Sequence, residues 1–165
     1  MGTQIGITGA ITDSSTTRQY ALGTEVSIGG KSYRYIEVDA GSSTLANGSL
    51  VYSMATGRNL VTDDISDTKN SLWRGVAVGA IASGSFGWVQ YAGPHSAAKV
   101  EGSGLAGSIA TFDGIKGSLT ADGCCAAVTA GVALSESAGI IGHATGASIS
   151  ANTVALFLEG ASENL

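Results

Sequence analysis

The chain has 165 residues and a mass of 16.3 kDa, and Gly, Ala, Ser and Thr together supply 85 of those residues. The net charge is −5 and the eight Lys and Arg residues are scattered singly, which argues against nucleic acid as a partner because phosphate backbones require a basic surface. No apolar stretch approaches the roughly 20 residues that span a bilayer, and no signal peptide is visible, so we expect no membrane partner and synthesis in a cytoplasm.

Residues 1–20 have the pattern of one weak extended segment followed by a polar link. Ile5, Ile7 and Ile11 alternate with small residues before the run from Thr12 to Thr17. Terminal segments of this kind are poorly ordered unless something holds them. The spacing therefore predicts an N-terminal arm that docks on a partner.

From Tyr20 onward the pattern is that of a β-sheet protein. Glu25–Ile28 and residues 33–38 flank Gly29-Gly30, which tolerates the positive φ angles of a tight hairpin turn. Further short apolar runs cover residues 50–54, 59–62, 72–81 and 87–91. No segment has apolar residues at helical spacing over three turns. The sequence predicts an all-β fold of one or two small β-barrel or β-sandwich units built from short antiparallel strands.

The single proline suggests a division of the chain. Pro94 follows Gly93, a pair typical of a link between units. We therefore expect an arm at 1–20, a first β unit at 21–93, a linker at 94–101 and a second β unit at 102–165. Segments 48–50 and 75–78 recur as 107–109 and 131–134, so an internal duplication is one interpretation of the second unit.

Few residues are spaced for chemistry. Asp63, Asp64 and Asp67 lie in an expected loop that either holds a hard cation such as Ca²⁺ or is a solvated acidic turn. Cys124 and Cys125 are adjacent, which suits neither an ordinary disulfide between them nor a shared metal. They are interpreted as small buried thiols, with an intermolecular bridge or a reactive thiol as the alternative.

The remaining chemical motifs are absent from the sequence. His95 and His143 have no Cys, Asp or Glu at metal-binding spacing and are interpreted as loop or surface histidines. No nucleophile elbow and no phosphate-binding loop is present. We therefore expect no catalytic residues, no cofactor and no small-molecule substrate, and hence a protein that is not an enzyme.

Aromatic side chains are concentrated before residue 100. Large rings dominate burial and are also enriched at interfaces, so they either form the core of this unit or meet another subunit or a shell. Together with the arm, the candidate interface residues are Ile5, Ile7, Ile11, Tyr20, Tyr33, Tyr35 and Trp73.

Several segments resemble a known group of proteins. Ala21-Leu22-Gly23-Thr24, the hairpin ending Tyr33-Arg34-Tyr35-Ile36, and residues 46–52 are similar to the opening of small structural proteins of tailed phages. Residues 75–77, 84–93, 132–134 and 154–158 resemble the closing strands of the same group. These are the capsid decoration, or cement, proteins, and the resemblance covers residues 20–160.

The resemblance implies a mechanical role. A decoration protein binds the capsid exterior in the virion, bridges neighbouring major capsid proteins and often forms a dimer or trimer. It also implies that the arm adds a strand to a capsid edge or crosses to a neighbour. Two other classes remain as alternatives: a structural component of the tail or a fibre, and a carbohydrate-binding module or hydrolase.

Overall fold

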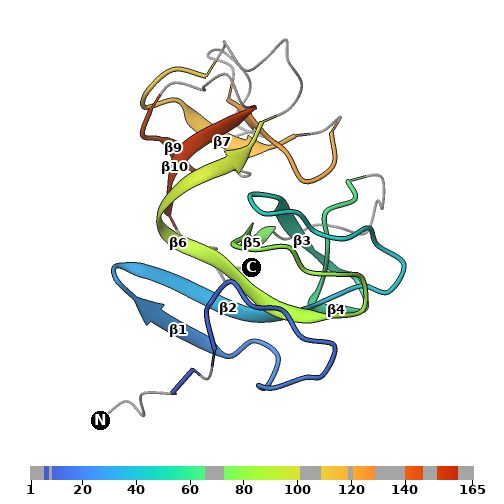
Figure 1. Ribbon diagram of the computed structural model, residues 1–165. Helices are drawn as coiled ribbons and strands as arrows, with labels where there is room; N and C mark the ends of the chain where they lie inside the picture. Colours follow the sequence, from blue (N-terminus) through green and yellow to red (C-terminus); the bar gives the residue numbers. More distant parts are fainter. Residues whose placement is uncertain are drawn as a thin grey trace.

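The computed structural model describes residues 6–7, 9–65, 73–100, 109–118, 121–128, 140–146 and 152–159. Within these ranges the chain forms ten strands and no helix, so the predicted all-β class is confirmed (Figure 1). The strands are β1 (Glu25–Ile28), β2 (Lys31–Val38), β3 (Leu50–Met54), β4 (Gly57–Thr62), β5 (Trp73–Ala77), β6 (Phe86–Lys99), β7 (Gly114–Gly117), β8 (Cys125–Ala127), β9 (Ile140–Ala144) and β10 (Thr153–Glu159).

The first half of the chain closes into a ring of five strands. β2 pairs in parallel with β4, antiparallel pairs link β4, β3, β5 and β6 in that order, and β6 pairs back onto β2. The predicted β1–β2 hairpin is present, with Ile28 opposite Lys31 across the Gly29-Gly30 turn. A cluster of buried aliphatic side chains belongs to this half: Ile36, Val38, Leu45, Val51, Val61, Ala77, Ile81 and Val89.

The second half of the chain is built outward from β6. The sheet continues antiparallel from β6 through β10, β9 and β7 to β8. A parallel bridge between Val100 and Cys125 links the end of β6 to β8. The core of this half also includes Leu50 and Val76, which come from β3 and β5. The two halves therefore share one apolar cluster.

The linker expected at 94–101 is wrong for residues 94–99, which continue β6 (Figure 1). β6 is 14 residues long and changes its partner near Gly93: Ala92 still pairs with β2, whereas Pro94 pairs with Phe157 of β10. The Gly-Pro pair therefore marks a change of partner within one strand. Segments 107–108 and 131–134, on which the duplication rests, lie outside the described residues.

The N-terminal segment lies against the first half. Ser15 forms a bridge to Phe86 through two backbone hydrogen bonds of 3.0 and 2.8 Å. Ile7 and Ile11 pack against a buried cluster of Tyr33, Tyr35 and Trp88. The segment therefore covers aromatic side chains of its own chain.

Gly93 gives a test of how tightly β6 approaches the turn between β1 and β2. Its φ is +88°, and a Cβ at this position would overlap the carbonyl oxygen of Gly30. Gly29 has a φ of +59° with no heavy atom within 4 Å of such a Cβ. We expect Gly29→Ala to lower the free energy of unfolding by roughly 1–2 kcal/mol through backbone strain alone. Gly93→Ala adds the overlap and should cost roughly 3 kcal/mol or more.

Thermal unfolding of both variants measures the difference in stability between them. In a chain of this size, each kcal/mol of lost stability lowers the Tm by about 2–4 °C. Equal losses in Tm would contradict the close approach of β6 to this turn.

Candidate interaction surfaces

The aromatic side chains of the first half are mostly in its interior. Tyr33, Tyr35 and Trp88 are only 6%, 3% and 3% exposed. Tyr35 contacts Tyr20 edge to face at a ring-centroid distance of 5.1 Å and Trp88 at 5.0 Å. Such contacts stabilise a core beyond the area they bury. The aromatic side chains were interpreted either as core or as an interface, and for Tyr33 and Tyr35 the interpretation as core therefore holds.

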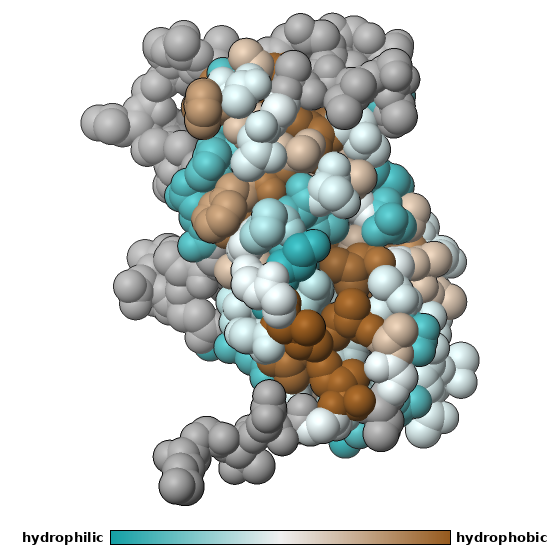
Figure 2. All heavy atoms as spheres, turned by 60° about the vertical axis from the view of Figure 1, so that its left-hand side comes forward, coloured by the Kyte–Doolittle hydropathy of each residue, from teal (hydrophilic) through white to brown (hydrophobic). Residues whose placement is uncertain are grey.

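The described residues of the expected arm contact other residues of the same chain. Ile7, Ile11 and Tyr20 are half-buried and pack against the aromatic cluster. The backbone N–H of Gln19 also donates to the Tyr35 hydroxyl at 3.2 Å. Ile5 lies outside the described residues. Figure 2 shows apolar side chains gathered on the lower half of the face that it draws.

Trp73 belongs to the joint between the halves. It pairs with Tyr52 across β5 and β3, and both side chains pack against the shared core. Burial raises the pKa of Tyr52. Among the described residues, neither the Tyr52 hydroxyl nor the Trp73 indole N–H has a hydrogen-bond partner. A Cβ at Gly117 would overlap the Tyr52 hydroxyl, so this contact between halves depends on glycine.

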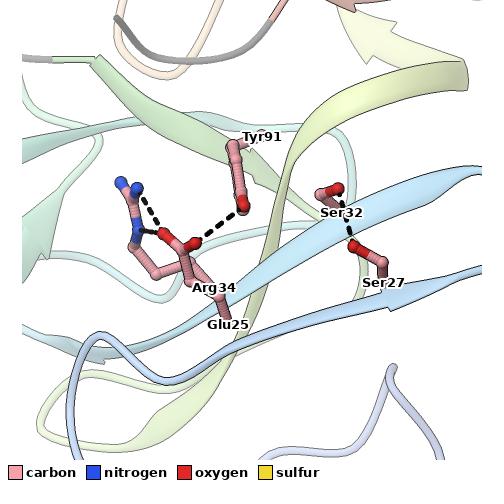
Figure 3. A network of polar contacts seen from close by, with 5 residues as sticks. All are labelled: Glu25, Ser27, Ser32, Arg34 and Tyr91. Atoms are coloured by element: carbon pink, nitrogen blue, oxygen red, sulfur yellow. Dashed lines mark hydrogen bonds and ion pairs between the residues drawn. The ribbon is translucent and has the colours of Figure 1, made fainter. Parts of the chain in front are cut away.

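A network of polar side chains links β1 to the five-stranded ring of the first half (Figure 3). Arg34 donates to Glu25 Oε1 through Nε at 3.0 Å and Nη2 at 2.7 Å, and Tyr91 donates to Glu25 Oε2 at 3.0 Å. The Arg34 guanidinium also lies 4.7 Å from the Tyr91 ring centroid, within the range of a cation–π contact. Burial, followed by Glu25, raises the pKa of Tyr91. The network thus joins strands β1, β2 and β6.

A second polar group lies where β6 changes partner. Gln90 Nε2 donates to the carbonyl oxygens of Ala92, Gly93 and Pro94 at 3.2, 3.2 and 2.9 Å. Gln90 Oε1 lies 3.1 Å from His95 Nδ1, which is the donor because an amide oxygen only accepts. His95 is 7% exposed, so its interpretation as a loop or surface histidine is wrong. The residues around the bend thus satisfy one another's hydrogen bonds.

His95 makes stability depend on pH. Burial first, and the nearby Lys31 charge second, lower the pKa of His95 from 6.5 to about 4. Because the folded chain favours the neutral ring, this contribution to stability is complete above pH 6.5 and falls as the pH drops to 4. The free energy of unfolding should decline by up to about 1.4 kcal/mol per pH unit in this window from His95 alone.

Chemical unfolding at a series of pH values tests this prediction. His95→Gln should have a shallower slope between pH 6.5 and 4 than the unaltered chain, because carboxylates contribute equally to both. Parallel profiles for the two proteins would refute the assignment.

The acidic segment is partly built into the fold. Asp63 is 6% exposed and accepts a hydrogen bond from Ser43 Oγ at 3.1 Å, and burial is the main cause that raises its pKa. Asp122 accepts from the backbone N–H of Ile65 at 3.0 Å. Asp64 is half-buried, and Asp67 lies outside the described residues. In the described ranges, no three His, Cys, Asp or Glu side chains are placed to hold a metal ion.

The two cysteines are free thiols. Cys125 belongs to β8 and is fully buried, and burial raises its pKa to about 12. Cys124 is half-buried. The interpretation as a buried thiol therefore holds for Cys125, whose sulfur is protonated at neutral pH and hence a poor nucleophile.

Exposed large hydrophobic side chains lie elsewhere than expected. Among the described residues these are Ile28, Phe112 and Phe157, at 50%, 81% and 41% exposure. Phe157 stacks on His143 of the neighbouring strand at a centroid distance of 5.5 Å, and His143 Nδ1 lies 3.1 Å from Glu159 Oε1. The alternation of side chains along a strand could have predicted that Phe157 is exposed, because its neighbours Leu156 and Leu158 point inward.

Replacement of Ile11 tests whether the N-terminal segment stabilises the chain. Ile11→Ser removes apolar surface from the aromatic cluster and should lower the free energy of unfolding by roughly 1–2 kcal/mol. Ile28→Ser is the matched control, because Ile28 is 50% exposed and should lose less. Thermal unfolding of both variants measures the effect. A Tm for Ile11→Ser at or above that of Ile28→Ser would show that the segment does not contribute.

Comparison with known protein families, with curated proteins and with solved structures yields no match for this chain. The described residues include no helix long and apolar enough to cross a membrane.

Proposed function

We propose that the chain is a structural virion protein that binds the outer surface of a phage capsid and cements neighbouring capsid subunits. The sequence resemblance of residues 20–160 to decoration proteins supports this proposal. So does the all-β frame, in which the described segments that carry the resemblance contribute to β1, β2, β3, β5, β6 and β10.

The observation that carries the proposal is the continuity of β6 through both halves. A protein that bridges two neighbours must transmit load between its contact points. β6 pairs with β2 through residues 86–92 and with β10 through residues 92–99. The shared core, which joins Leu50 and Val76 to the second half, resists separation of the two halves. The chain can therefore act as one stiff element between two subunits.

The proposed mechanism is the summation of modest contacts. Ile28 lies in the first half and Phe112 and Phe157 in the second, so exposed apolar side chains occur on both parts of the frame. Single contacts of this size bind weakly, but a dimer or trimer on a repeating shell gains avidity from every further contact. The net charge of −5 is compatible with a position outside the shell, away from DNA.

Binding to capsid shells tests the proposed function. Shells assembled from the major capsid protein of the same genome are mixed with the purified chain, sedimented and assayed for bound protein. We expect saturation at a fixed number of copies per shell and a higher disruption temperature for saturated shells. The matched control is bovine serum albumin at the same concentration, which should stay in the supernatant.

Two outcomes would contradict the proposal. Absence of the chain from sedimented shells, together with immunogold labelling of the tail or a fibre in virions, would favour the tail alternative. Retention on a polysaccharide resin in place of shells would favour a carbohydrate-binding module.

A further inference from the structure

Phe112 is the most exposed large hydrophobic side chain that the described residues contain, and its backbone is unusual. It is 81% exposed and has a φ of +73°. A positive φ is strained for a bulky residue with a Cβ. Hydrogen bonds fix the conformation: Phe112 N donates to the Ala144 carbonyl at 2.8 Å, and Asp113 N donates to the Ala110 carbonyl at 3.1 Å. The turn therefore fixes the backbone from which the exposed ring extends.

Four other turns of the chain have the same construction with glycine at this position. Each begins with alanine, whose carbonyl accepts a hydrogen bond of 3.0–3.3 Å from the fourth residue, and the third residue has a φ between +63° and +84°. The third residues of these turns are Gly23, Gly48, Gly84 and Gly123. The fold thus needs a positive φ at residue 112 but does not need a phenylalanine, since glycine adopts this conformation without strain.

The surroundings of Phe112 place it at the end of the second half of the sheet. The Ala144 carbonyl that it binds belongs to β9, and Ala144 pairs with Leu156 of β10. The next residue of β10 is Phe157, which stacks on His143. An aromatic side chain has only two side-chain torsions and loses little entropy on binding, and such residues are the usual anchors of interfaces.

The area of this contact indicates the kind of partner. A phenylalanine buries roughly 150–250 Å². A stable complex of two free proteins needs roughly 800 Å² on each side. Phe112 and the partly covered Phe157 fall well short of this area, so they suit a partner that presents many equivalent sites. We propose that Phe112 is an anchor residue that inserts into an apolar pocket of the capsid shell, an inference that rests on the proposed function.

The test compares shell binding and stability of Phe112→Gly. This variant has glycine at the third position of the turn, as the other four turns do, so we expect a Tm within about 2 °C of the original value or above it. Shell binding in the sedimentation assay should weaken at least about tenfold, as expected for loss of an anchor. Phe112→Tyr keeps the ring and should retain binding. Unchanged shell binding by Phe112→Gly, or failure of this variant to fold, would overturn the proposal.

A relocated ring is the matched control. Gly84 has a φ of +66°, and the nearest atom to a Cβ there is Ala40 Cβ at 3.9 Å, so a side chain fits. Phe112→Gly combined with Gly84→Phe keeps an exposed ring at an equivalent turn and should not recover binding. Recovery would show that any exposed ring suffices and would overturn a specific anchor.

Sedimentation velocity of the free protein separates the remaining outcomes. If the unaltered chain does not bind shells, the proposed function fails and the assignment of the partner fails with it. If the unaltered chain binds shells and Phe112→Gly also changes the oligomeric state of the free protein, a second copy is the occupant and the assignment to the shell is overturned. An unchanged oligomeric state with weakened shell binding supports the anchor.

Discussion

The shared strand β6 is the constraint on which the rest of the structure depends. Its first part closes the ring of the first half against β2 and β5, and its second part starts the sheet that contains β10. The hydrogen bonds of Gln90 to three successive carbonyls hold the region where the partner changes. Movement of one half would have to break pairs in the other half, so the halves behave as one body.

The abundance of small residues is a condition of this arrangement. At Gly75, a Cβ would lie 2.7 Å from the Gln90 carbonyl oxygen, and at Gly142 it would overlap the backbone of Phe157. Close approach of strands leaves little room for bulk, so the apolar residues divide into three clusters. A thin core of this kind gains stability from the many backbone hydrogen bonds of the sheet and from the N-terminal segment.

Local sequence patterns predicted the strands better than their connections. The Gly29-Gly30 hairpin and the strand at 50–54 could be read from turn residues and alternation. The parallel pair of β2 with β4 and the closure of β2 on β6 join segments far apart in the chain, for which alternation carries no information. Pro94 was misleading because a Gly-Pro pair also fits a strand that bends and changes its partner.

Side-chain type alone could not separate core from interface. Both faces of β2 are buried, so Tyr33 and Tyr35 on one face and Ile36 on the other are equally hidden, and an aromatic stripe gives no sign of this. The deciding physical quantity is exposure, which depends on the N-terminal segment and on β6 covering those faces. Turn sequences carry more local information. A phenylalanine at a position where four other Ala-initiated turns have glycine conflicts with the backbone that it must adopt, and burial offers no compensation for that conflict at residue 112. Such a local conflict is a stronger indication of a binding role than the abundance of rings in the first half.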